Sequence, residues 1–137
     1  MAIRTGTIGC LFALLLGIAA DSPAQVGPYP DEWKASKTEG VLLPQYCWAQ
    51  MMGIEGPPEY YLPGNCGTSN HYCLGLLKIV RANKVVGDKG LKKKLYELAK
   101  RDTLYTLNGM KDATQCTLRP DVERTLLQID SRLKVLN

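Results

Sequence analysis

The chain has 137 residues, a formal net charge of +4 and five cysteines, and 45% of its residues are hydrophobic. This length suits one domain and excludes a TIM barrel, which needs about 250 residues, and it leaves little room for a complete Rossmann domain. The sequence contains no G-x-S-x-G elbow, no P-loop and no H-E-x-x-H motif. We therefore predict a protein that is not an enzyme, with no catalytic residue, no bound metal and no cofactor.

Residues 1–25 have the three parts of a secretory signal peptide: a positive charge at Arg4, an apolar run over residues 11–20 and small residues at 22–24. The apolar run is half the length of about 20 residues that a membrane-spanning helix needs, and no later stretch is longer. We therefore expect a periplasmic or secreted protein with no transmembrane span in the mature chain.

The next residues, 26–40, are rich in proline, glycine and charge and lack periodicity, which predicts a flexible leader before a domain at 41–137. A first helix is expected near 44–53, because Pro44 suits its first turn and Gly53 its exit. Its apolar side would consist of Tyr46, Cys47, Trp48 and Met51.

Residues 54–67 carry three prolines and three glycines, which predicts a long loop without regular structure. We expect Tyr60 and Tyr61 in this loop to contact a binding partner, since tyrosine supplies a large contact area at low entropic cost. The alternative is a loop that its own aromatic side chains fold onto the helices.

A second helix is expected over 69–85, with Thr68, Ser69 or Asn70 as its cap. Gly75 in the middle of this helix would cost about 1 kcal/mol relative to alanine, which indicates a close contact with another helix. The predicted buried stripe consists of Cys73, Leu76, Leu77 and Val80.

A third helix is expected over 89–107, after a break marked by Gly87 and Gly90, and a fourth over 120–136. The predicted apolar face of the third helix consists of Leu91, Leu95, Leu98 and Tyr105, with Ala99 beside them. That of the fourth consists of Val122, Leu126, Ile129, Leu133 and Leu136, at the spacing of an amphipathic helix. No run of alternating β-branched residues occurs, so the fold class is all-α, a small antiparallel bundle of about four helices.

The mature chain keeps four cysteines, which in an exported protein favours two disulfides and allows three pairings. Cys47, about six residues before the end of the first helix, and Cys73, about four to five residues after the start of the second, would lie at similar height in an antiparallel pair. Cys66 and Cys116 would lie in loops at one end of the bundle. The expected bridges are therefore Cys47–Cys73 and Cys66–Cys116.

Between residues 78 and 101 there are nine basic and two acidic residues, a local charge of +7. This basic segment indicates either a solvated helical face or a surface for an acidic partner, an anionic lipid or a polyanionic saccharide. Within it, Lys92, Lys93 and Lys94 are the candidate partner-binding residues. No nucleic acid partner is expected, because the chain is exported and aromatic residues do not interleave with the basic ones.

His71 is the single histidine of the chain. A small metal- or redox-handling protein is the alternative that it raises, with Cys66, Cys73 and the Met51–Met52 pair as soft ligands that suit copper(I). Disulfides at the two cysteines would remove both sulfurs from such a site. We therefore expect His71 to be a packed residue in the first turn of its helix.

Four segments, LPQYC (43–47), NHYCLGLLKIVRA (70–82), ELAKRDTLYTL (97–107) and RPDVERTLLQI (119–129), carry a resemblance to known proteins. They resemble small exported bacterial proteins of tetratricopeptide-like helical-hairpin type. In those proteins a Y-C helix is followed by an H-Y-C-x-G-L helix and an A-x-x-D-x-x-Y-x-L helix. The resemblance implies a helical scaffold that binds a protein or peptide partner in the cell envelope.

Overall fold

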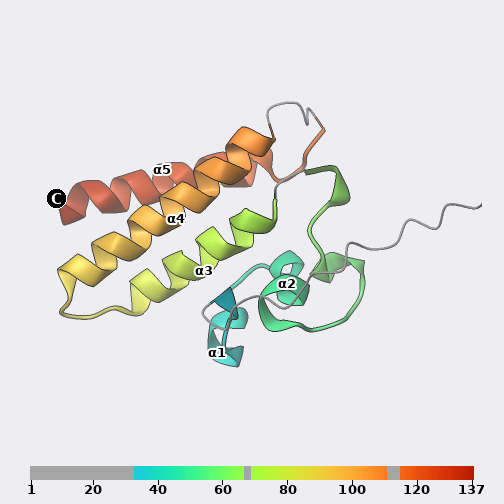
Figure 1. The fold of residues 1–137 in the computed structure, drawn as a ribbon, viewed down its shortest axis with the longest axis horizontal. Helices are drawn as coiled ribbons and strands as arrows, with labels where there is room; N and C mark the ends of the chain where they lie inside the picture. Colours follow the sequence, from blue (N-terminus) through green and yellow to red (C-terminus); the bar gives the residue numbers. More distant parts are fainter. Residues whose placement is uncertain (1–32, 67–68, 111–114) are drawn as a thin grey trace, which may run out of the picture.

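The computed structural model describes residues 33–66, 69–110 and 115–137, and every regular element within these ranges is helical. Three long helices, α3 (Asn70–Lys84), α4 (Lys89–Gly109) and α5 (Arg119–Leu136), form one layer in which α4 lies between α3 and α5 (Figure 1). A layer of short elements packs on the other side of α3. The predicted all-α, disulfide-stapled architecture is therefore confirmed, while the expected signal peptide at 1–25 lies outside the described residues.

Residues 33–66 are termed the N-terminal layer. They contain the elements α1 (Lys37–Gly40), η2 (Gln45–Cys47), α2 (Trp48–Met52), η3 (Pro58–Tyr60) and η4 (Gly64–Cys66), where η marks a single 3₁₀ turn. The first helix expected near 44–53 is thus a 3₁₀ turn followed by a short α-helix. Gly53 ends it in the left-handed region at φ 64°, as its position predicts. The loop at 54–67 holds two 3₁₀ turns where no regular structure is expected.

The element α1 lies where the composition predicts a flexible leader. A capping box forms it: Glu39 N donates to Ser36 Oγ at 3.3 Å, and Ser36 N donates to Glu39 Oε2 at 2.9 Å. Ala35 N donates to Met51 O at 2.8 Å, and Arg81 Nε on α3 donates to Glu39 Oε1 at 3.0 Å. The described part of this segment, 33–40, is therefore packed onto the helical domain.

The close contact expected at Gly75 joins α3 to α4. A Cβ atom at this position would lie 2.8 Å from Thr103 Oγ1 and 3.2 Å from the carbonyl oxygen of Ala99. Thr103 is fully buried, and its hydroxyl donates to Ala99 O at 2.8 Å, so no polar group is left without a partner there. The cost of a glycine within α3 is thus offset by the close packing of the two helices.

The buried face of α4 differs from the predicted leucine face. Leu91 is 46% exposed and Tyr105 is 52% exposed, while Leu95 and Leu98 are half-buried. The buried residues of α4 are instead Tyr96, Ala99, Asp102, Thr103 and Thr106. The physical reason is Gly75: a helix surface with a glycine at its centre accepts the small side chains Ala99 and Thr103, and leucine there would hold the helices apart.

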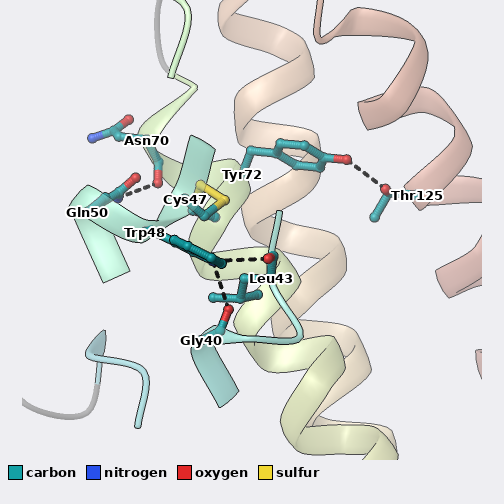
Figure 2. Close-up of a disulfide and its surroundings, with 9 residues drawn as sticks. Gly40, Leu43, Cys47, Trp48, Gln50, Asn70, Tyr72 and Thr125 are labelled. Carbon is teal, nitrogen blue, oxygen red and sulfur yellow. Dashed lines mark hydrogen bonds between the residues drawn. A yellow bond between two sulfur atoms is a disulfide. The ribbon is translucent and has the colours of Figure 1, made fainter. Parts of the chain in front are cut away.

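The helix α5 follows its predicted pattern. Pro120 stands in the first turn, where its missing N–H costs nothing. Val122 and Ile129 are buried, and the hydroxyl groups of Tyr72 on α3 and Thr125 on α5 share a hydrogen bond of 2.9 Å (Figure 2). Burial raises the pKa of Tyr72 above its ordinary value. The contact between Tyr72 and Thr125 ties α3 to α5 at one end of the three-helix layer.

Both predicted disulfides are present. Cys47 bonds to Cys73 with their Cα atoms 5.5 Å apart, and Cys66 bonds to Cys116 at 4.8 Å. The first joins the N-terminal layer to α3 (Figure 2) and the second joins the loop before α3 to the segment before α5. Two such buried bridges are consistent with a location outside the cytoplasm.

Candidate functional site

The two tyrosines predicted to meet a partner have different environments. The ring of Tyr60 packs edge-on against Trp48, with the ring centroids 5.0 Å apart. The Trp48 indole is itself held by hydrogen bonds from Nε1 to Gly40 O at 3.0 Å and to Leu43 O at 3.2 Å (Figure 2). Tyr61 is 44% exposed. The loop is thus folded onto the N-terminal layer by Tyr60, and Tyr61 alone of the pair presents much of its ring to solvent.

The nine basic residues between 78 and 101 do not form one continuous face. Lys78 on α3 is paired with Asp102 on α4, and Lys100 on α4 reaches Asp130 on α5 at 2.7 Å. With the Arg81–Glu39 pair, three of the nine side chains link elements within the fold. One third of the basic side chains in this segment therefore form ion pairs between elements of the fold.

The consecutive residues Lys92, Lys93 and Lys94 point to different sides of α4, because neighbours on a helix are about 100° apart. Lys92 and Lys89 border a cavity of about 230 Å³. This cavity lies at the connection from α3 to α4, which Figure 1 shows at the end of the molecule away from the loop after α2. The structure therefore does not bring the three lysines together with Tyr60 and Tyr61.

His71 lies in the first turn of α3, as expected, beside a buried carboxylate. Its ring packs on Tyr105 of α4 with centroids 4.2 Å apart, and its Nδ1 lies 4.0 Å from Asp102 Oδ1. Asp102 is only 6% exposed and also meets Lys78 and, at 3.9 Å, Arg101 Nε. This cluster holds α3 and α4 together through one carboxylate with cationic side chains around it.

The metal alternative loses its two cysteine ligands in this structure. Cys66 and Cys73 are both in disulfides, so neither offers a thiolate, and Met51 is fully buried. Across the described ranges, no group of three or more His, Cys, Asp or Glu side chains is placed to hold a metal ion. Nor does any helix in these ranges combine the length and apolarity needed to cross a bilayer.

A cavity of about 330 Å³ opens between α3 and α5, along from the Tyr72–Thr125 contact. Ile79 and Asn83 of α3 form one wall, Gln128 and Arg132 of α5 form the other, and Tyr96 of α4 lies between them. The helices α3 and α5 therefore meet at one end of the layer and leave a wedge-shaped space further along.

A second cavity of about 400 Å³ borders the same stretch of α3. It shares Ile79 and Asn83 with the first, and its opposite wall is the segment from Leu42 to Pro44. Leu42 is 60% exposed there. The two cavities together are termed the α3 groove, a surface lined by α3, α5 and the N-terminal layer.

The α3 groove is mostly apolar and carries positive charge. Lys84 and Arg132 are its charged lining residues, and no acidic residue lines either cavity. The Tyr96 hydroxyl donates to Asn83 Oδ1 at 2.5 Å, which fixes the orientation of the Asn83 amide. The arrangement suits an apolar peptide segment that carries acidic side chains or exposes its polar backbone. Carboxylates of such a segment would meet Lys84 and Arg132, and no acidic lining residue would repel them.

The comparisons show no family for this chain. No protein-family model matches it, and neither a curated protein nor a solved structure matches it with significance. The geometry of its own residues must therefore support any statement of function.

The apolar residues of α3 cover more of the helix than the predicted buried stripe. Cys73 and Leu77 of that stripe are buried, but Leu76 and Val80 are half-buried, as is Ile79, which the stripe did not include. A helix with more apolar surface than one neighbour can cover often presents the remainder to a partner. The interhelical pairs of Asp102 with Lys78 and of Glu39 with Arg81 have no such signal in the sequence.

Proposed function

We propose that the protein is an exported interaction module that binds an acidic, partly apolar peptide segment of a protein partner in the cell envelope. The observation that carries this proposal is the α3 groove. Its two cavities share Ile79 and Asn83, and their only charged lining residues are Lys84 and Arg132. An open apolar groove with a polar rim is the surface on which a peptide lays its apolar side.

The scaffold around the groove supports this role. The helices α3 and α5 form opposite walls of one cavity, and both pack on α4. The Cys47–Cys73 bridge holds the third wall, the N-terminal layer, against α3. A groove whose walls are fixed before binding loses little conformational entropy when the peptide enters, which raises affinity. The tetratricopeptide-like resemblance of the sequence and its signal-peptide pattern agree with a binding scaffold that acts outside the cytoplasm.

The test begins with a peptide-display selection against the folded, oxidised protein, followed by dissociation constants for the selected peptides. We expect the selected peptides to combine apolar residues with aspartate or glutamate. Reversing both groove charges in K84E/R132E should weaken binding about tenfold or more, with a smaller effect at high salt. K37E/R124E is the matched control, since Lys37 and Arg124 are exposed and line neither cavity of the groove.

The apolar part of the groove has its own pair of variants. Leu42→Ser removes an exposed leucine that lines the groove. Its control is Leu127→Ser, which removes a leucine of α5 that is 72% exposed and lies outside the groove. We expect Leu42→Ser to weaken the peptide about fivefold to tenfold and Leu127→Ser to leave it unchanged. Equal affinities for all four variants, or peptide-induced NMR shifts confined to Tyr61 and the loop around it, would overturn the groove as the binding site.

A further inference from the structure

The connection between α3 and α4 presents an apolar residue at the end of the molecule. Val86 is 93% exposed in this connection. Gly87 follows it in the left-handed region at φ 80°, which lets the chain reverse within residues 85–88. A valine kept almost wholly in water costs solvation free energy that burial against an apolar phase would recover.

Lysines surround this apolar apex. Lys84 ends α3, and Lys89, Lys92 and Lys93 lie in the first turns of α4. Within the part of the chain that the structure describes, none of the four forms an ion pair. The single acidic residue in the connection, Asp88, is occupied as the N-cap of α4, where its Oδ1 accepts from Leu91 N at 2.8 Å. The positive charge of the apex therefore has no ion-pair partner among the described residues.

The last turn of α5 reaches the same end. Leu136 lines the cavity of about 230 Å³ together with Val85, Lys89 and Lys92. Next to it, Val135 is 80% exposed. Figure 1 shows the α3–α4 connection and the end of α5 on one side of the molecule. Two exposed valines and a set of unpaired lysines thus share one end, here termed the basic end.

We propose that the basic end docks on an anionic lipid bilayer, with Val86 entering the interface and the lysines meeting headgroup phosphates. Each lysine near an anionic bilayer contributes attraction that falls off within a Debye length, and an apolar side chain adds binding that salt does not screen. A polyanionic saccharide would use the lysines but leave Val86 in water. The exposure of Val86 at the apex therefore favours the bilayer.

This docking leaves most of the peptide-binding surface free, because the basic end is at the tip of the three-helix layer and the α3 groove runs along its side. Lys84 alone belongs to both surfaces. The two sites can therefore be tested with separate variants, using Lys89, Lys92 and Val86 for the bilayer.

The experiment is sedimentation of the full oxidised protein with two kinds of phosphatidylcholine vesicle. One kind contains about 30 to 40% of the anionic lipid phosphatidylglycerol, and the other contains none. We expect binding to the anionic vesicles only. K89Q/K92Q should weaken binding about tenfold or more, and its matched control K37Q/R124Q, which removes two exposed charges elsewhere, should retain most of it. Val86→Ser should weaken binding about fivefold to tenfold at any salt concentration, whereas Val41→Ser, at a valine that is 69% exposed, should not.

Three results would overturn the proposal. The first is equal binding to vesicles with and without phosphatidylglycerol. The second is an equal loss in K89Q/K92Q and K37Q/R124Q, which would mean that net charge alone attracts the protein. The third is wild-type binding by Val86→Ser together with tight binding to a soluble polyanion such as heparin, which would assign the basic end to a polysaccharide.

Discussion

The N-terminal layer and the three-helix layer are held together by different kinds of interaction. In the three-helix layer, α3, α4 and α5 pack through small and apolar side chains, with Gly75 against Thr103 at the closest approach. The N-terminal layer has no element longer than five residues. It is fastened to the rest of the fold by the Cys47–Cys73 and Cys66–Cys116 bridges, by the Arg81–Glu39 pair and by a small core in which Leu43 and Met51 pack with Leu74 and Leu77 of α3. The comparison teaches that short turns need covalent and polar links in addition to apolar packing, where long amphipathic helices need only matching surfaces.

The largest expected effect comes from removing one of the two disulfides of the N-terminal layer. The Cys47–Cys73 bridge closes a separation of 26 residues, and its loss in C47A/C73A should cost about 3 kcal/mol of unfolding free energy. Hydrogen exchange should show lost protection at Ala35 N, which bonds to Met51 O, while the α4 amides around Thr103 stay protected. An equal loss of protection in α4 would show that the two layers unfold as one unit.

The next-largest effect is expected from a substitution that disrupts the packing of the three-helix layer. In Gly75→Ala the new methyl group would meet Thr103 Oγ1 at 2.8 Å, so we expect a net destabilisation of about 2 kcal/mol by denaturant unfolding. Gly90→Ala is the matched control, because its Cβ would meet only Asp88 Oδ1, at 3.5 Å, and alanine favours the helix. Gly90→Ala should stabilise by about 0.5 to 1 kcal/mol. If Gly75→Ala were also stabilising, the close approach of α3 and α4 would not exist.

A smaller, pH-dependent effect comes from the ion pair between the layers. The hydrogen bond from Arg81, followed by those from Ser36, lowers the pKa of Glu39 from 4.5 to about 2. Because the folded pKa lies below the unfolded one, this stabilisation is present above about pH 4.5 and is lost as the pH falls towards 2. Glu39→Gln should cost about 1 to 2 kcal/mol at pH 7 and progressively less below pH 4.5.

Urea unfolding of the wild type and Glu39→Gln at a series of pH values measures this difference. Glu97→Gln, at an exposed glutamate of α4, is the control and should change the free energy of unfolding by less than about 0.5 kcal/mol. A cost for Glu39→Gln that stays constant from pH 7 to pH 3 would contradict the assigned ion pair.

The smallest effect concerns the Trp48 indole. Trp48→Phe keeps an aromatic ring against Tyr60 and removes the N–H that donates to Gly40 O and Leu43 O. Gly40 O keeps a second donor in Leu43 N, so we expect a loss of only about 1 kcal/mol, measured by thermal unfolding. A loss above about 3 kcal/mol would mean that the N-terminal layer depends on this residue more than on its disulfide.

Much of the fold could be predicted because local signals mark its elements. The proline and glycine residues at 44 and 53 bound the first helical segment, and α3 and α5 begin and end within a residue or two of the expected positions. The cysteine pairing followed from antiparallel neighbours alone. The sequence also contains the Ser36–Glu39 capping-box pattern, but the proline and glycine residues of the segment favoured the prediction of a flexible leader.

The candidate sites were less predictable because they depend on which elements meet. The sequence places Tyr60 and Tyr61 side by side, so both were predicted to contact a partner. In the structure Tyr60 packs against Trp48, and Tyr61 is exposed. The run Lys92–Lys94 reads as one basic cluster, yet α4 spreads it over different sides of the helix, and Lys89 joins Lys92 instead. The α3 groove combines Leu42, Ile79 and Arg132, which lie far apart in the chain.

The sequence by itself determined the all-α class and the positions of the three long helices, because periodicity, caps and loop lengths act over a few residues. With the helices placed, their antiparallel order favoured one of the three possible pairings of the four cysteines. Only the tertiary structure decided which face of α4 is buried, which basic residues are paired and where a groove remains. Those outcomes depend on the surface of a neighbouring element, as Gly75 shows by selecting Ala99 and Thr103 over the leucines of the same helix.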